Sequence, residues 1–145
     1  SVFIFSSLVS IGNEAFHWCK KLETISFGEE SNLTTIGYSA FSCCDELKSI
    51  SIPSSVKSIG NKAFKQCSKL ENILFEEESN LTTIGMYAFY KCESLKSISI
   101  PSSVETIGQA AFKDCSNLEN VSFQEPLILT IICNFEKIKF YDLYL

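Results

Sequence analysis

One short pattern recurs along this chain, and the repetition limits the possible folds more than any other feature. The frame Ile-Gly-x-x-Ala-Phe-x-x-Cys-x-x-Leu defines five successive coils, which begin at Ile11, Ile36, Ile59, Ile84 and Ile107. The steps between these starts are 25, 23, 25 and 23 residues. A repeat of this length is typical of a solenoid, in which no single unit buries its own apolar face and each unit packs on its neighbours.

The alternating step makes the true unit a pair of coils. Residues 28–75 and 76–123 are identical at 33 of 48 positions, so the two segments form a duplicated block. One coil of each pair is closed by a Pro-Ser-Ser turn and the other by a Glu-Glu-Ser-Asn turn. The difference in turn length explains the alternation.

Each coil contains the same parts in the same order. A short extended segment ends at Ile-Gly, where glycine permits a sharp backbone turn. Ile59, Ala63, Cys67 and Leu70 then follow at spacings of 4, 4 and 3, which predict a brief helical turn. A strand of period 2 comes next, with inward pairs such as Ile50 and Ile52. The expected fold is an α/β repeat solenoid: a right-handed coil of short parallel strands with short helical turns.

These residues carry a family resemblance. The segment LKSISIPSSVKSIGNKAFKQCSKLENI resembles the BspA-like class of leucine-rich repeats, found in surface proteins of oral bacteria and mucosal protozoa. The match covers roughly residues 2–123. We therefore expect a leucine-rich-repeat solenoid over residues 1–125, with five full coils after an N-terminal half coil. Residues 126–145 are expected to form a divergent cap or tail, in which Leu129 and Ile132 keep the spacing of Leu81 and Ile84 but Cys133 replaces the glycine.

The repeated cysteine could serve as a metal ligand, a disulfide partner, a reactive thiol or a core residue. Equivalent positions of a solenoid stack about 4.8 Å apart, so a column of parallel side chains cannot converge on one zinc ion at about 2.3 Å. Disulfides between neighbouring coils remain a less favoured alternative. We predict a buried column made of Cys19, Cys44, Cys67, Cys92 and Cys115. A second core column is predicted for Phe16, Phe41, Phe64, Phe89 and Phe112. Cys43 falls at an outward position and is predicted to be exposed and alkylated first.

Composition disfavours several classes of function. The net charge is −5, no arginine is present, and His17 is the only histidine. Nucleic-acid binding normally needs a basic face with arginine, so no nucleic-acid partner is expected. Histidine is the commonest side chain in acid–base catalysis and a frequent zinc ligand, so a single histidine disfavours both functions. We expect no catalytic residues, no metal and no cofactor. The chain shows neither a signal peptide nor a membrane anchor, and residues 127–133 are too short to span a bilayer, so no membrane insertion is expected.

Charged residues form two further patterns. A column of alternating sign precedes the inward strand residues: Glu23, Lys48, Glu71, Lys96 and Glu119. Each charge is expected to lie next to an opposite one, which favours correct register more than stability. The acidic turns at 29–30 and 76–78 are predicted to be about 10 Å apart, too far for one calcium site, and thus to form a solvated edge.

The outward strand positions give the candidate ligand-binding residues on a predicted concave face. One row contains Thr24, Ser49, Asn72, Ser97 and Asn120, and the next contains Ser26, Ser51, Leu74, Ser99 and Ser122. These small side chains permit close approach of a shaped protein partner. Candidate N-glycosylation sequences begin at Asn32, Asn80 and Asn120.

The resemblance implies a non-catalytic, adhesin-like or antigenic protein at the cell surface or secreted. Its expected partners are host or neighbouring-cell proteins, such as extracellular-matrix components. The alternative is an intracellular leucine-rich-repeat scaffold for protein–protein interaction, since the cysteines also suit a reducing compartment.

Overall fold

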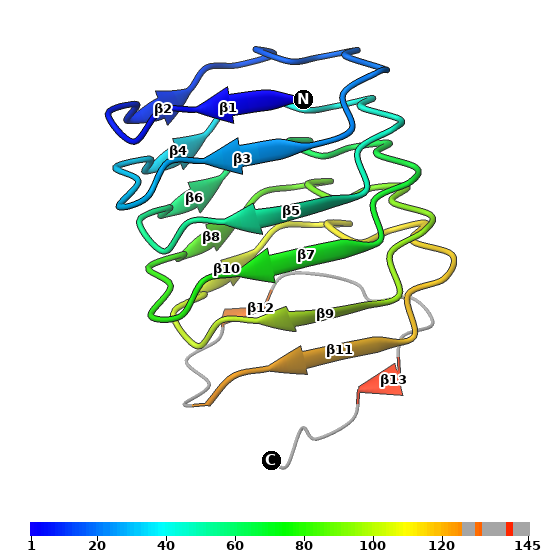
Figure 1. Cartoon of the computed structure of the whole chain (residues 1–145). Helices are drawn as coiled ribbons and strands as arrows, with labels where there is room; N and C mark the ends of the chain where they lie inside the picture. Colours follow the sequence, from blue (N-terminus) through cyan, green and yellow to red (C-terminus); the bar gives the residue numbers. More distant parts are fainter. Residues whose placement is uncertain (126–129, 132–138, 141–145) are drawn as a thin grey trace.

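Two columns of parallel strands form the molecule, and the coils stack so that each contacts the next (Figure 1). The computed structural model describes residues 1–125, 130–131 and 139–140. One column consists of the longer strands: β1 (Val2–Ile4), β3 (Ile25–Phe27), β5 (Ser49–Ile52), β7 (Asn72–Phe75), β9 (Ser97–Ile100), β11 (Asn120–Phe123) and the shorter β13 (Lys139–Phe140). The other column consists of β2 (Ser10–Ile11), β4 (Thr35–Ile36), β6 (Ser58–Ile59), β8 (Thr83–Ile84), β10 (Thr106–Ile107) and β12 (Thr130–Ile131).

The strand register confirms the coil alignment. In the two-residue strands Ile11, Ile36, Ile59, Ile84 and Ile107 are successive partners in one continuous six-stranded sheet. In the longer strands Ile50 pairs with Ile73 and Ser51 with Leu74. Alternate side chains point inward, as period 2 requires, so Ile50 and Ile52 are buried while Ser49 and Ser51 are exposed.

The residues between the two strand columns form a turn layer rather than a helix, so the predicted helical turns are wrong. This layer comprises residues 12–22, 37–47, 60–70, 85–95 and 108–118. Two residues four apart in each coil have left-handed backbone, as Lys62 and Gln66 do with φ of 60° and 59°. Such residues interrupt an α-helix. Throughout the described residues no helix forms, and so none is present that could cross a bilayer.

Hydrogen bonding explains why the turn layer is stable without a helix. Successive N–H groups donate alternately within the coil and to the next coil. The N–H of Ala63 bonds the Gly60 carbonyl at 3.2 Å, whereas that of Phe64 bonds the Ala88 carbonyl at 2.8 Å. The N–H of Gln66 in turn bonds the Tyr90 carbonyl at 2.7 Å. Every second donor therefore joins two coils, which an α-helix, with its donors used internally, would prevent.

The repeated glycines have a different role from the one predicted. None of them has positive φ, so none is required for a left-handed turn. A Cβ atom added at Gly60 would instead lie 2.7 Å from the Gly37 carbonyl carbon, and one at Gly85 would lie 2.5 Å from the Asn61 backbone nitrogen. Glycine is needed here because consecutive coils approach each other too closely for any side chain.

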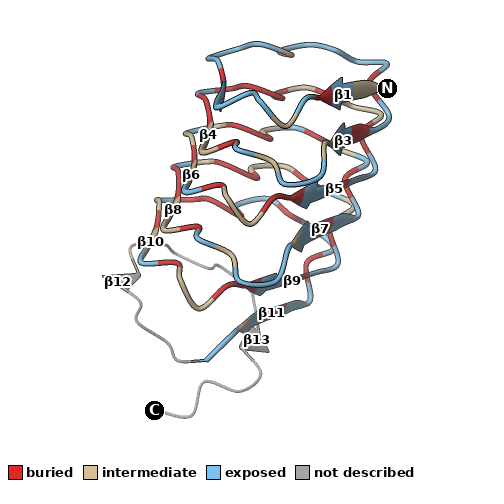
Figure 2. Cartoon of the chain, turned by 60° about the vertical axis from the view of Figure 1, so that its left-hand side comes forward, coloured by how far each residue is buried: buried red, intermediate tan, exposed pale blue. Residues whose placement is uncertain are grey.

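The core is a stack of similar layers enclosed by the strands and the turn layer (Figure 2). The predicted phenylalanine column is confirmed: ring centroids lie 5.1 to 5.4 Å apart, with interplanar angles of 0° to 11°. Phe41, Phe64 and Phe89 are fully buried. Phe16 is only half-buried, because it has a ring neighbour on one side alone.

The C-terminal segment continues the stack in part. Thr130 and Ile131 pair with Thr106 and Ile107, and Lys139 and Phe140 pair with β11. The sequence alignment put Ile132 opposite Ile107, so the predicted register is wrong by one residue. The other residues of the predicted cap at 126–145, including Leu129 and Cys133, lie outside the described residues.

Candidate functional site

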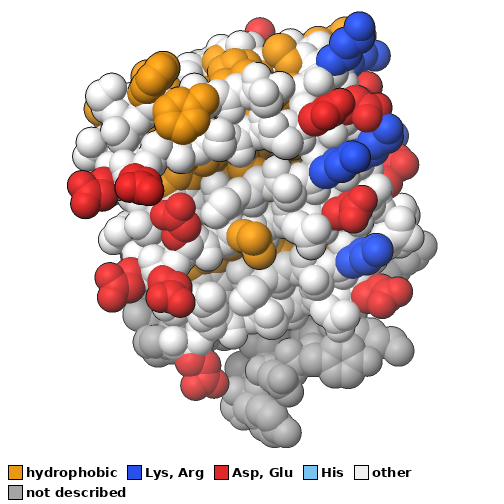
Figure 3. Space-filling view, viewed as in Figure 1, with side chains coloured by type: hydrophobic (Ala, Val, Ile, Leu, Met, Phe, Trp, Pro, Cys, Tyr) orange, Lys and Arg blue, Asp and Glu red, His pale blue; other side chains and the backbone are white. Residues whose placement is uncertain are grey.

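All ten predicted binding residues lie on one exposed surface, the outer side of the longer strands, which we call the long-strand face. Each of them is exposed. The register places Ser49 beside Asn72, Ser97 beside Asn120 and Ser99 beside Ser122. Adjacent strands of a sheet lie about 4.8 Å apart, so the two predicted rows run along the stack. Figure 3 shows this face as mostly small, uncharged side chains with few apolar exceptions.

Leu74 is the predicted apolar exception, and its side chain is 62% exposed. It is flanked by the hydroxyl of Ser51 on β5, its partner in the register. Leu74 belongs neither to the buried core nor to the partly buried hydrophobic residues packed against it. It is therefore a candidate contact point.

Sequence reasoning missed Phe3 and Phe5. Phe3 pairs with Ser26, so it belongs to the same row as Leu74, and it is 53% exposed. Phe5 is 70% exposed, and the two rings meet edge to face with centroids 5.2 Å apart. The signal was present, because aligning Val2 and Ile4 with Ile50 and Ile52 already puts position 3 in the outward row. In Figure 3 apolar side chains gather at the β1 end of this face.

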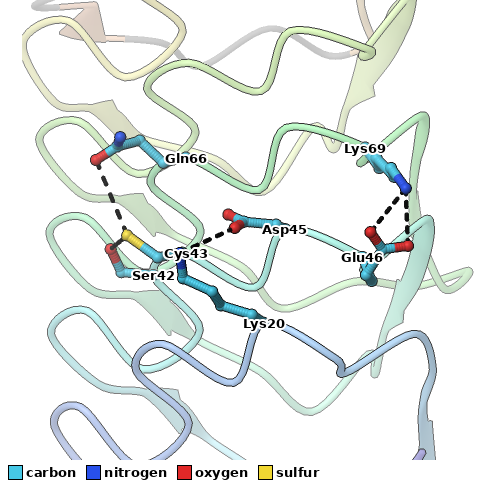
Figure 4. Close-up of polar contacts among 7 residues, drawn as sticks. All are labelled: Lys20, Ser42, Cys43, Asp45, Glu46, Gln66 and Lys69. Atoms are coloured by element: carbon cyan, nitrogen blue, oxygen red, sulfur yellow. Dashed lines mark hydrogen bonds and ion pairs between the residues drawn. The ribbon is translucent and has the colours of Figure 1, made fainter.

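The charge column borders the long-strand face, and its signs alternate along one side in Figure 3. Its members are exposed, and none of them forms an ion pair within 4.0 Å with another described residue. The ion pairs of the described residues are Lys20 with Asp45 at 3.7 Å and Lys69 with Glu46 at 2.7 Å, both in the turn layer (Figure 4). The column therefore acts through long-range attraction between neighbours, which salt screens.

The opposite border is formed by the turns that follow the longer strands. Asn32 and Asn80 lie there, and the side-chain amide of each donates to a backbone carbonyl of the preceding coil, that of Ser6 or Ser54, at 3.1 Å. Glu76 accepts a hydrogen bond from the Ser54 N–H at 3.0 Å. Both asparagines are exposed, as is Asn120 on the long-strand face. No group of three potential metal-ligating side chains occurs within the described residues, the acidic turns included.

Four column cysteines are buried, which confirms their predicted core role: Cys44, Cys67, Cys92 and Cys115. Each thiol donates to the carbonyl of the column phenylalanine in the preceding coil, with sulfur–oxygen distances of 3.1 to 3.3 Å. Burial raises the pKa of Cys44 and of Cys115 to about 12, and those of Cys67 and Cys92 well above the usual value. These side chains are thus protonated thiols at neutral pH and poor nucleophiles.

The prediction that Cys19 is buried is wrong, because this cysteine is exposed. A column cysteine packs against the preceding coil, and Cys19 belongs to the first turn-layer segment of this chain. Cys43 is intermediate rather than fully exposed. Its sulfur lies 3.7 Å from the Ser42 hydroxyl and 3.9 Å from the Gln66 side-chain oxygen (Figure 4). All six cysteines of the described residues are free thiols.

Comparison with solved structures shows similarity to several repeat proteins. The crystal structure of the pneumococcal vaccine antigen PcpA is 33% identical, with a TM-score of 0.82 over 85% of this chain and 30% of that chain. A leucine-rich-repeat protein of T. pallidum is 32% identical, with a TM-score of 0.76 over 83% of this chain and 58% of that one. A leucine-rich cell surface protein of Faecalibacterium prausnitzii is 26% identical, with a TM-score of 0.60 over 84% of this chain and 38% of that one.

The chain thus spans less than two thirds of the length of these three structures. A comparison with curated protein sequences finds no match. The family model for the BspA type leucine-rich repeat region matches residues 1–119 and 34–142, in six copies. With the stacked coils and their repeated core columns, this match shows that the chain belongs to the BspA-type leucine-rich-repeat family.

Proposed function

We propose that this chain is a non-catalytic protein-binding part of a cell-surface or secreted protein, an adhesin or antigen that engages host or matrix proteins. The observation that carries the proposal is the long-strand face, an open surface of small polar side chains with exposed apolar residues at Phe3 and Leu74. The likeness to a vaccine antigen and to a leucine-rich cell surface protein supports the surface location. Neither catalysis nor a cofactor forms part of the proposal.

The composition of the face suits protein recognition. Serine, threonine and asparagine form hydrogen bonds without obstructing a partner's backbone. Binding energy in protein interfaces concentrates in a few apolar anchors surrounded by weaker contacts that exclude water. Complete burial of a leucine side chain stabilises a complex by about 1.5–3 kcal/mol. Leu74, which stands alone among serines, fits the anchor role.

Binding of the chain to a panel of matrix and cell-surface glycoproteins tests the proposal, measured at low and at physiological salt. We expect saturable binding that Leu74→Glu or Ser51→Lys abolishes. Val9→Glu is the matched control: Val9 is 57% exposed, lies off the long-strand face, and takes the place that Glu105 occupies four coils later. Equal loss of binding with Val9→Glu, or no binding to any member of the panel, would contradict a role for this face.

A second candidate function is an intracellular scaffold, which the thiols favour. Cys19 is exposed and Cys43 is partly exposed, and free accessible thiols persist best in a reducing compartment. Protease treatment of intact source cells distinguishes the two. Loss of the protein's signal in an immunoblot supports the surface proposal, whereas full protection until the cells are lysed supports the scaffold.

A further inference from the structure

A cluster of tyrosines and lysines on the turn layer belongs to none of the features described so far. We call it the tyrosine–lysine surface, and it consists of Tyr38, Lys62, Lys65, Tyr87, Tyr90, Lys91 and Lys113. The backbone register joins its members across coils, since the N–H of Gln66 bonds the Tyr90 carbonyl and that of Lys91 bonds the Lys113 carbonyl at 3.0 Å. The surface is therefore continuous through four successive coils.

Ammonium groups and tyrosine rings are in contact within this surface. The Nζ of Lys62 lies 3.3 Å from the Tyr38 hydroxyl and 5.4 Å from the centre of its ring. The Tyr90 ring has two ammonium neighbours, Lys65 at 5.8 Å and Lys91 at 5.5 Å. Tyr87 packs edge to face on Tyr90, with ring centroids 5.5 Å apart. These cation–π contacts hold the lysines beside the rings.

The lysines of this surface form no ion pair within the part of the chain that the structure describes. The ion pairs of the described residues involve Lys20 and Lys69 alone, although the whole chain carries a net charge of −5. The hydrogen bond and the charge of Lys62 lower the pKa of the exposed Tyr38 hydroxyl, while the negative charge of Glu14 opposes that shift. Four lysines that form no ion pair within the described residues make this surface locally positive, although Asp114 directly follows Lys113.

We propose that the tyrosine–lysine surface binds a linear anionic polysaccharide that carries sulfate or carboxylate groups. The lysines pair with the anionic groups, and the tyrosine rings pack against the C–H faces of the sugars. A ring face is electronegative and attracts such weakly positive C–H groups. Lysine binds phosphate as well as sulfate and carboxylate, so single-stranded DNA serves as the competing polymer in the test.

The arrangement suits a long polymer rather than a small anion. Lys65, Tyr90 and Lys113 occupy the same place in three successive coils, so a positive group, a ring and a positive group follow one another over about 10 Å. Each exposed ion pair changes affinity by about fivefold at most. A single sulfate ion would therefore bind very weakly, whereas a chain laid along the solenoid makes several such contacts at once.

The test uses the full chain and five probes: heparin for sulfate, hyaluronate for carboxylate, neutral dextran, polyglutamate and single-stranded DNA. We expect heparin or hyaluronate to bind, with affinity falling as salt rises, and dextran not to bind. Heparin carries sulfate and carboxylate groups whereas hyaluronate carries carboxylate alone, so binding of heparin without hyaluronate would show that carboxylates alone do not suffice. Binding at low and physiological salt is measured by biolayer interferometry with the protein immobilised.

Two variants locate the site. Lys65→Gln with Lys91→Gln should weaken polysaccharide binding about tenfold. Lys48→Gln with Lys96→Gln is the matched control, because both lysines are exposed, belong to the charge column and change the net charge equally. Tyr90→Ala should weaken binding without altering net charge, and a melting curve of each variant verifies its fold.

The proposal is overturned if the control pair loses as much affinity as the test pair, since binding would then follow net charge alone. Equal or tighter binding of polyglutamate or single-stranded DNA would assign the surface to another class of polymer. No binding to heparin or hyaluronate at low salt would also overturn it. None of these variants changes the long-strand face, so the results do not depend on the proposed protein partner.

Discussion

Gly85→Ala should destabilise the chain strongly, while the same change at Gly12 should not. The two glycines occupy the same place in the repeat, and neither has positive φ, so the alanine backbone is allowed at both. They differ in their surroundings. A Cβ atom at Gly85 would lie 2.5 Å from the Asn61 nitrogen and 2.6 Å from the Gly60 carbonyl carbon, whereas one at Gly12 would meet no atom within 4 Å.

The size of the effect follows from the distance that the coils must move. Carbon contacts are most favourable at roughly 3.5–4.0 Å, so the backbones would have to separate by about 1 Å. Overpacking of this kind costs about 1–3 kcal/mol. Separation also stretches inter-coil hydrogen bonds such as that from the Gly85 N–H to the Ile59 carbonyl, now 2.8 Å, each of which contributes about 1 kcal/mol. We expect a total loss of about 3 kcal/mol.

Gly12→Ala should be neutral or stabilise the chain by about 0.4–1 kcal/mol, because alanine restricts the unfolded state and meets no obstacle in the folded one. Urea unfolding followed by far-UV circular dichroism measures both variants against the parent chain. Equal destabilisation by both would show that glycine is required for backbone conformation, as the sequence first suggested. No effect of Gly85→Ala would show that the coils separate freely, which would refute the close-approach argument.

Three further predictions concern the core columns. Phe64→Ala should cost roughly 3–5 kcal/mol, and Phe16→Ala clearly less because that ring is half-buried with one stacked neighbour; equal changes in melting temperature would contradict the end effect. A native-state alkylating reagent should label Cys19 and Cys43 well before the four buried column cysteines, and peptide mass spectrometry reports the order. Since burial raises the pKa of Cys44 from 9.0 to about 12, the folded chain keeps a proton that the unfolded chain releases. Unfolding free energy should therefore fall as pH rises from about 9 toward 12, and Cys44→Ala should make that fall shallower in urea titrations.

Much of the fold could be predicted from the sequence, because stacking imposes the same residue on every coil. The isoleucine and phenylalanine columns lie where the repeat places them. The helical turn was predicted wrongly for a physical reason. Spacings of 4, 4 and 3 bring Ile59, Ala63, Cys67 and Leu70 to one side in a helix, but they do so equally in a series of tight turns. A single coil does not reveal that half of its N–H groups bond to the next coil.

For the candidate site too, positions within one coil could be predicted from the sequence, whereas contacts between coils could not. Which strand positions face outward follows from period 2, so the exposure of the two predicted rows could be derived. Phe3 was missed because it precedes the first complete repeat of the sequence, although its alignment with Ser26 follows from the same rule. The contacts of the tyrosine–lysine surface join residues of different coils, such as Lys65 and Tyr90, and so depend on the register.

The duplicated block shows how the two proposed surfaces differ in specificity. Residues 28–75 and 76–123 differ at 15 positions, and ten of these lie in the turn layer. Most core positions match, whereas the turn layer varies more, so the buried Ser42 in one block corresponds to the partly exposed Tyr90 in the other. The long-strand face changes at Leu74, where the second block has Ser122, and otherwise keeps its outward pattern. A partner on the long-strand face would therefore meet nearly the same surface in each block. Leu74 is the main feature by which such a partner could tell the first block from the second. A polymer on the turn layer meets a different set of rings and charges in each block, so its binding has one preferred position along the stack.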